Sequence, residues 1–131
     1  MSNIDREMMS RALQLAAKGR FTSSPNPSVG CVIARDGIIV GEGFTRPAGG
    51  NHGEIEALYK AGDATGATAY VTLEPCAMCA MAMVHARIKR VVYAAADPKT
   101  GACGSVFDLL GDPRHNHKVE VQGGLLAEEA G

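Results

Sequence analysis

The chain has 131 residues, 46% of them hydrophobic, and a formal net charge of -1 at pH 7. This length allows one well-buried core and is too short for two ordinary domains, so we expect one domain over residues 1–131. No window approaches the roughly 20 apolar residues of a membrane span, and the charge does not indicate a nucleic-acid binder. Four cysteines without a signal peptide favour thiols, metal ligands or catalysis in a cytoplasmic protein over a disulfide framework.

Helix and strand patterns alternate from the start of the chain. Residues 5–18 place apolar side chains at helical spacing before Gly19, which predicts a first helix. Residues 29–40 contain two β-rich runs around Asp36-Gly37, which predicts a hairpin.

The alternation continues to the end of the chain. Residues 52–61 predict a short helix that buries Ile55, Leu58 and Tyr59. The later elements are predicted as a strand at 69–73, a helix from Pro75 to about Ala86, a strand at 90–95, a loop at 97–105 and a last strand around 118–121. A hairpin followed by such units predicts an α/β fold with a mixed sheet and helices on its faces.

Two cysteines three positions apart follow a proline in the segment TLEPCAMC. Pro75 suits the first position of a helix, so Cys76 and Cys79 would share one side of its opening turn, where free N–H groups favour thiolates. This spacing fits a redox pair, a structural zinc site or half of a catalytic metal site. A structural site needs four protein ligands, whereas Cys31 and Cys103 are isolated, and we expect Cys31 to be a core residue.

His52 is the best candidate for a third metal ligand, with Glu54 two residues later. One histidine and two thiolates leave a fourth tetrahedral position open, as is typical of a catalytic zinc that lowers the pKa of bound water to about 7. Glu54 could then carry protons to a substrate nitrogen. Because residues two apart do not share a helix face, His52 would have to lie at an irregular helix start. A helix-capping histidine and a surface glutamate are the alternatives.

Together, His52-Gly-Glu54 and Pro75-Cys-Ala-Met-Cys79 resemble the H-x-E…P-C-x-x-C signature of zinc-dependent nucleobase deaminases. The resemblance implies Zn²⁺ held by the histidine and the two cysteines, and Glu54 as the catalytic proton carrier of a hydrolytic deamination. It also implies the cytidine-deaminase-like fold, in which three layers (α/β/α) are built around a mixed five-stranded sheet.

The likeness to particular subfamilies changes along the chain. From about Thr72 onward, TLEPCAMCAMAMVHARIKRVVYAAADPKTGACGSVFDLL resembles the bacterial tRNA adenosine deaminases. The earlier segment RALQLAAKGRFTSSPNPSVGCVIARDGIIVGEGF is similar to the deaminase domain of the riboflavin-pathway enzyme that acts on a ribosylaminopyrimidinone phosphate. The likeness changes near TLEPC, a segment that both families share, so a join at this point would leave no trace in the sequence. The chain is therefore interpreted as a recombinant or engineered hybrid, or as a divergent natural member.

The compact spacing of the two motif cysteines favours the tRNA type, because riboflavin-type enzymes usually carry a long insertion there. By resemblance to the tRNA deaminases, Asp97 would contact the ribose and Lys99 a phosphate, with a solvated turn as the alternative for both. Thr45 stands where that family has an asparagine that helps to hold the nucleoside. Asn26 belongs to the riboflavin pattern, in which it lines the pocket.

The function predicted first is therefore deamination of adenosine to inosine at the wobble position of a tRNA anticodon loop. The alternative within the class is the riboflavin-pathway pyrimidine deaminase, with a small pyrimidine nucleotide as substrate. An alternative of another class is a non-catalytic, zinc-stabilised RNA-binding module. Resemblance to the tRNA enzymes also implies a homodimer.

Overall fold

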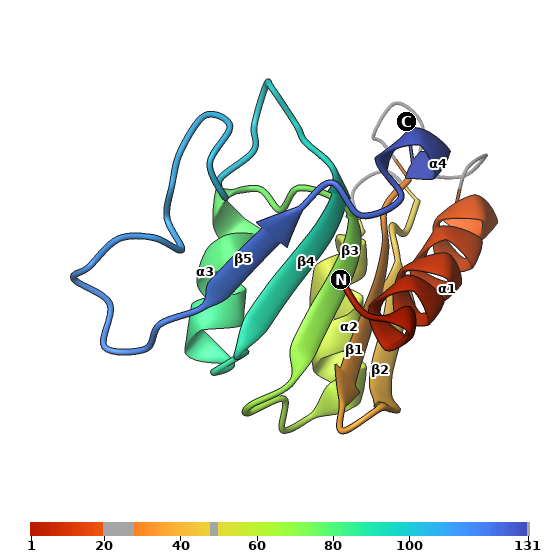
Figure 1. Cartoon of the computed structure of the whole chain (residues 1–131), viewed down its shortest axis with the longest axis horizontal. Helices are drawn as coiled ribbons and strands as arrows, with labels where there is room; N and C mark the ends of the chain where they lie inside the picture. The colour runs from red at the N-terminus through yellow and green to blue at the C-terminus, as the bar shows by residue number, and fades with distance from the viewer. Residues whose placement is uncertain (20–27, 48–49, 131) are drawn as a thin grey trace.

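The computed structural model describes residues 1–19, 28–47 and 50–130 (Figure 1). The elements follow one another as α1 (Asn3–Gly19), β1 (Gly30–Arg35), β2 (Ile38–Phe44), α2 (Gly53–Ala61), β3 (Thr68–Leu73), α3 (Ala77–His85), β4 (Arg90–Ala95), β5 (Glu120–Gly123) and α4 (Ala127–Ala130). The predicted hairpin is confirmed, and its turn residues Asp36 and Gly37 both have positive φ, at 55° and 76°. This conformation suits a two-residue hairpin turn.

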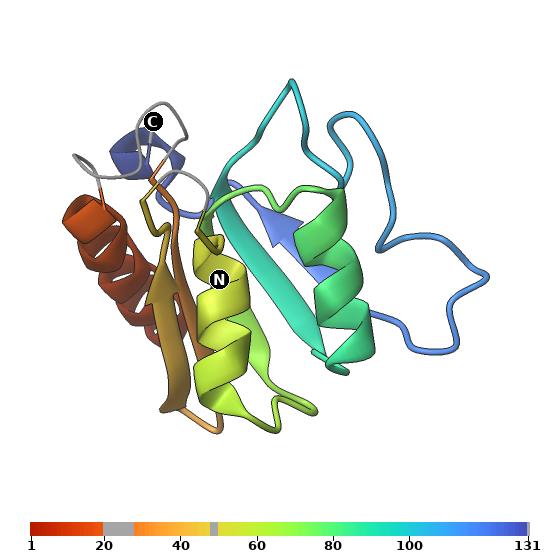
Figure 2. The same cartoon turned by 180° about the vertical axis from the view of Figure 1, so that it is seen from behind.

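The sheet has five strands in the order β2-β1-β3-β4-β5. β1 is antiparallel to both of its neighbours, whereas β3, β4 and β5 run parallel. β2, β3, β4 and β5 therefore end, and β1 begins, at one edge of the sheet. The N-termini of α2 and α3 lie at this same edge (Figure 2). Segments far apart in the sequence thus meet there, as ligand-binding segments do in open α/β sheets.

Helices cover both faces of the sheet, α1 and α4 on one side and α2 and α3 on the other (Figures 1 and 2). Alternate side chains of β1 divide between the two cores: Cys31 and Ile33 pack with the side of α2 and α3, and Val32 and Ala34 with the side of α1. The predicted three-layer α/β/α fold with a mixed five-stranded sheet is confirmed, as is the buried position of Cys31. No helix in the described ranges is long and apolar enough to span a membrane.

The predicted burial of Tyr59 is wrong. Its side chain is 84% exposed, while Ile55 and Leu58 are half-buried. The buried positions of α2 are Gly53, Glu54 and Ala57. Small residues bring this helix close to the sheet, and position 59, two residues beyond Ala57, falls on the opposite side of the helix.

Element boundaries also differ from expectation at the helix after β3 and at the C-terminus. Pro75 does not begin a helix, because Cys76 is still extended at φ −76° and ψ 175° and acts as the N-cap of α3. The last strand is Glu120–Gly123, two residues later than predicted, and the four-residue helix α4 was not predicted. So short a helix has little periodicity from which to predict it.

Candidate metal centre

Three predicted metal ligands come together at the edge of the sheet where α2 and α3 begin. The Nδ1 atom of His52 lies 3.8 Å from the Sγ of Cys76 and 3.5 Å from the Sγ of Cys79. All three candidate ligand atoms lie within 4.8 Å of one another. The three residues come from two helix starts, so the packing of α2 beside α3 is what builds the cluster.

The local backbone explains why these side chains face one another. His52 is the N-cap of α2, extended at φ −67° and ψ 155°, and Cys76 is the N-cap of α3. Neither N-cap side chain makes a capping hydrogen bond. His52 therefore lies just before the helix, as the sequence required. Gly53 allows a close approach, because an added Cβ would lie 2.5 Å from the carbonyl oxygen of Val29.

The donor set and its spacing fit a zinc ion. Bonds of about 2.3 Å to sulfur and about 2.0 Å to nitrogen at a tetrahedral angle place the two donors about 3.5 Å apart, close to the observed 3.5 Å and 3.8 Å. One nitrogen and two sulfurs leave a fourth position, as in catalytic sites with two cysteines and one histidine. These three residues could therefore hold Zn²⁺.

Electrostatics around the two cysteines favour binding of a cation. The hydrogen bond with Cys79 lowers the pKa of Cys76 to about 5, and backbone N–H groups of Cys79 and Met78 add to this shift. The same hydrogen bond, together with burial, raises the pKa of Cys79. The lowered pKa of Cys76 favours its thiolate, which is the form that ligates metals.

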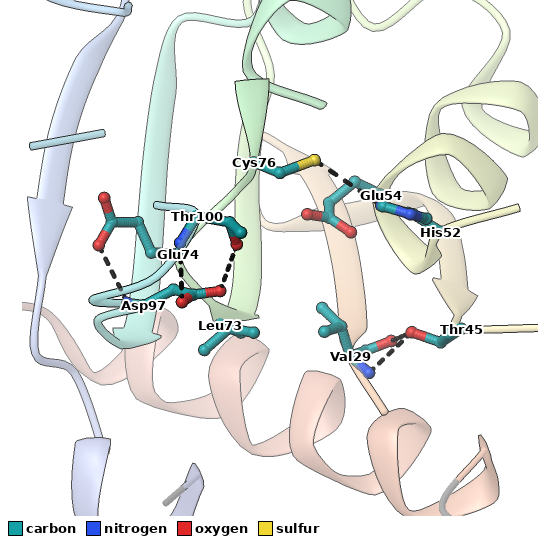
Figure 3. Close-up of a pocket in the computed structure, with 9 residues that line it drawn as sticks. All are labelled: Val29, Thr45, His52, Glu54, Leu73, Glu74, Cys76, Asp97 and Thr100. Carbon is teal, nitrogen blue, oxygen red and sulfur yellow. Dashed lines mark hydrogen bonds between the residues drawn. The ribbon is translucent and has the colours of Figure 1, made fainter. Parts of the chain in front are cut away.

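Glu54 lies beside the cluster, within the first turn of α2, and is 4% exposed. Burial raises its pKa to about 7, and the negative charge of Cys76 acts in the same direction. In Figure 3 its carboxylate points toward the space in front of Cys76. A buried carboxylate with a pKa near neutrality can both accept and release a proton at neutral pH.

A pocket of about 120 Å³ opens beside these residues. It is lined by Val29, Thr45, His52, Glu54, Leu73, Glu74, Cys76, Asp97 and Thr100 (Figure 3). Pockets for drug-sized ligands usually measure about 300–1,000 Å³. The enclosed space therefore suits one heterocyclic ring, and larger parts of a ligand would lie at its mouth.

Thr45 lines the pocket, as predicted for a substrate-binding residue, but its hydroxyl has another partner. It accepts a hydrogen bond from Val29 N at 2.9 Å and lies 3.3 Å from Val29 O, to which it can donate (Figure 3). Thr45 thus fixes the start of β1 against the end of β2. Contact with substrate through this hydroxyl stays a prediction, and Asn26 lies outside the described residues.

Asp97 also lines the pocket, and its carboxylate closes the turn that follows β4. One oxygen accepts hydrogen bonds from the backbone N–H groups of Lys99 and Thr100, at 2.9 Å and 3.2 Å, and the other accepts from the Thr100 hydroxyl at 2.7 Å. The Thr100 hydroxyl and these backbone N–H groups lower the pKa of Asp97. Lys99 is exposed on the same turn. Contacts of these two residues with sugar and phosphate remain predictions.

Glu74 is a pocket residue that the sequence interpretation missed. It is 2% exposed and accepts hydrogen bonds from the loop after β4. Burial would raise its pKa, but hydrogen bonds from Ser105, Cys103 and Asp97 outweigh this and hold the pKa below its usual value. The sequence feature that could have indicated this residue is a glutamate directly after the apolar strand Thr68–Leu73. A charged side chain next to a buried strand requires hydrogen-bond partners.

The geometry and the fold together define a metal-dependent enzyme class, and comparison with known proteins identifies the family. Residues 2–95 match the family model of the cytidine and deoxycytidylate deaminase zinc-binding region. The chain therefore belongs to this family. The assignment confirms the predicted class, a zinc-dependent hydrolytic deaminase with the cytidine-deaminase-like fold.

The relatives include both predicted subfamilies. A diaminohydroxyphosphoribosylamino-pyrimidine deaminase of Buchnera aphidicola subsp. Acyrthosiphon pisum is 45% identical over 93% of this chain and 85% of its own length. A tRNA-specific adenosine deaminase of Haemophilus influenzae is 43% identical over 98% of this chain and 79% of its own. The solved structure of Acinetobacter baumannii RibD superposes with a TM-score of 0.82 at 41% identity, over 97% of this chain and 36% of that one.

Both kinds of relative align along nearly the whole chain, so similarity to each extends beyond the half in which it was first noticed. The chain spans about a third of the length of the riboflavin biosynthesis proteins RibD that it matches. The hybrid origin stays a prediction.

Proposed function

We propose that this chain is a hydrolytic deaminase that removes an exocyclic amine from a diaminohydroxyphosphoribosylamino-pyrimidine, with residues 1–131 forming one deaminase domain. The observation that carries the proposal is the buried Glu54 beside the His52, Cys76 and Cys79 donors, in a pocket large enough for one ring. A relative of nearly the same length with this named activity, 45% identical, supports the substrate.

In the proposed reaction, zinc bound by His52, Cys76 and Cys79 would supply a water molecule acidic enough to ionise near neutral pH. The carboxylate of Glu54 accepts a proton from the attacking water. It delivers this proton to the ring nitrogen next to the carbon that bears the amine. It then accepts the second proton of the former water from the hydroxyl group added to that carbon, and passes it to the departing nitrogen as the carbon–nitrogen bond breaks, so that the nitrogen leaves as ammonia. Burial of Glu54 suits both transfers, because the shifted pKa lies near neutrality.

The charge of the pocket supports the pyrimidine as the substrate. Among the described residues that line it, Glu54, Glu74 and Asp97 are acidic and none is a lysine or arginine. An RNA would bring several phosphate groups near this acidic lining, whereas the ribosylaminopyrimidine phosphate brings one, so the lining opposes RNA more strongly. The net charge of -1 also lacks the basic excess that domains binding RNA usually carry.

Deamination of tRNA adenosine is the second candidate. The compact Cys76–Cys79 spacing and the 43% identical tRNA-specific adenosine deaminase favour it. Asp97 and Lys99 would then contact the sugar and phosphate next to an adenine flipped into the pocket. A homodimer, predicted by resemblance to these enzymes, stays a prediction.

The experiment that separates the candidates compares two substrates. The zinc-loaded protein is incubated with the riboflavin-pathway pyrimidine and, separately, with a tRNA anticodon stem-loop carrying wobble adenosine, and ammonia is measured from each. We expect ammonia from the pyrimidine and none above background from the stem-loop. Inosine formation with no pyrimidine turnover would favour the second candidate, and no ammonia from either substrate would contradict both.

A further inference from the structure

Glu74 is tied to one segment of the chain, the loop after β4. Its Oε1 accepts hydrogen bonds from Asp97 N at 3.2 Å and from the Ser105 hydroxyl, and its Oε2 accepts from Cys103 N at 2.9 Å and Ser105 N at 3.0 Å. All four donors belong to residues 97–105. Within the described parts of the chain, no lysine or arginine forms an ion pair with this carboxylate. The loop itself therefore stabilises the buried charge.

The loop is shaped around this carboxylate. Ala102 N donates to Pro75 O at 2.9 Å and Gly101 N to Asp97 O at 3.0 Å, so the chain turns closely over Glu74. A Cβ on Gly101 would lie 2.5 Å from the Cδ and Oε2 atoms of Glu74. Only glycine leaves room for the carboxylate at this point.

The loop also forms one wall of the pocket, through Asp97 and Thr100 (Figure 3). Because Asp97 N bonds to Glu74 while the Asp97 carboxylate holds Thr100, displacement of this anchor would move both lining residues. We propose that Glu74 is a positioning residue that fixes this wall and so sets how tightly the pocket holds its substrate. The effect on substrate binding that we expect from this inference rests on the proposed function.

The substitution Glu74→Gln tests the proposal, because it changes the hydrogen bonds on one side of the carboxylate only. A glutamine can accept on only one side, because its NH₂ group donates. With the NH₂ at the Oε1 position, the oxygen still accepts from Cys103 N and Ser105 N, and the Ser105 hydroxyl can turn to accept. The backbone N–H of Asp97 then faces the NH₂ group of the glutamine, which is also a donor, so this hydrogen bond is lost. The substitution is therefore expected to release the pocket residue Asp97 while the far end of the loop stays bound.

The first measurement is amide hydrogen exchange, resolved by NMR, on the zinc-loaded full chain. We expect Glu74→Gln to speed exchange at Asp97 N by about tenfold, the size expected for loss of one hydrogen bond to a charged group, with a smaller change at Cys103 N. Equal acceleration at both amides, or none, would overturn the proposal. This result does not depend on which substrate the protein uses.

The second measurement separates positioning from general stability by steady-state kinetics with the riboflavin-pathway pyrimidine. We expect KM to rise about tenfold, with kcat within about threefold and zinc content unchanged. The control is Asp5→Asn. Asp5 is a buried acid of α1, on the face of the sheet opposite α2 and α3, and it forms an ion pair with Arg90. Its loss should lower the melting temperature without raising KM. If KM follows the melting temperature in both variants, Glu74 is merely structural and the proposal fails.

Ser105→Ala provides a milder version if Glu74→Gln does not fold. It removes the hydroxyl donor to Oε1 and keeps three backbone donors, so a smaller rise in KM is expected, and an unchanged KM would contradict the proposal. If the unmodified protein releases no ammonia from the pyrimidine, the proposed substrate fails, while the exchange measurement still decides the role of Glu74.

Discussion

The chemistry of the site depends on how Glu54 differs from its neighbours. His52 and Cys76 are N-caps with extended backbone, and their side chains meet in front of the helices. Glu54 lies within α2 and is buried. Its carboxylate can therefore handle protons beside the donor cluster without being needed as a ligand.

Replacing Glu54 with Gln tests this division of roles. The change keeps shape and burial but removes the group that accepts a proton, so kcat should fall by about 10²–10⁴-fold while zinc stays bound at one ion per chain. Ammonia release and zinc content measured on the same sample check this. The control is Glu56→Gln on the same helix, which removes a half-buried acid paired with Arg46 of the segment after β2 and should preserve turnover. Activity retained by Glu54→Gln within tenfold would refute the assigned role.

At this scale the sequence predicted residues that belong to a compact motif. His52, Cys76 and Cys79 could be grouped because their types and spacing match a metal chemistry. Glu74 could not be assigned to the site in this way, because its role depends on hydrogen bonds from residues 23 to 31 positions away along the chain. The hydrogen bond between Thr45 and Val29 depends likewise on tertiary structure, because it joins the end of β2 to the start of β1.

Helix α1 is held to the sheet by a buried ion pair. Asp5 accepts two hydrogen bonds from Arg90 of β4, both at 2.9 Å, and one from the Tyr70 hydroxyl at 2.7 Å. The side chain of Asp5 is 6% exposed and that of Arg90 21%. The Arg90 hydrogen bonds lower the pKa of Asp5 well below its usual value, in spite of burial.

This shift predicts how stability depends on pH. A carboxyl group whose pKa is depressed on folding stabilises the protein above its unfolded pKa of about 3.9, and this stabilisation is lost as the pH falls toward the folded pKa. Asp5→Asn should lower the free energy of unfolding by about 3 kcal/mol at pH 7, since it breaks a buried pair, and by less at pH 3. Urea unfolding at both pH values measures this.

Glu7→Gln, on the exposed part of α1, changes the same charge and should leave both unfolding free energies nearly unchanged. An equal loss of stability at pH 7 and pH 3 in Asp5→Asn would contradict the linkage.

Most elements could be predicted because local patterns agree with the final packing. The hairpin followed from Asp36-Gly37, whose positive φ angles the turn requires. The misplaced start of α3 reflects Cys76, which is extended although its carbonyl accepts the helical hydrogen bond from Ala80 N at 2.9 Å. Sequence pattern does not distinguish an N-cap from a first helical residue at this precision.

In the whole molecule, the strand directions decide where the site can form. Four strands end and one begins at the edge where α2 and α3 start, which brings the donor cluster, Glu54 and the loop at 97–105 together around one pocket. The sequence predicted this layering from the order of its elements. The tRNA substrate was predicted first because the cysteine spacing can be read from the sequence. The size and the acidic lining of the pocket depend on how the chain packs, so the sequence pattern does not give them.

The measurement that tests the central claim most directly is ammonia release from the riboflavin-pathway pyrimidine as a function of zinc bound per chain. Protein stripped with a chelator and reloaded in steps should release ammonia in proportion to zinc content, reaching its maximum at one ion per chain and none at zero. Ammonia release that is independent of zinc, or a fully loaded protein that releases none, would contradict the account.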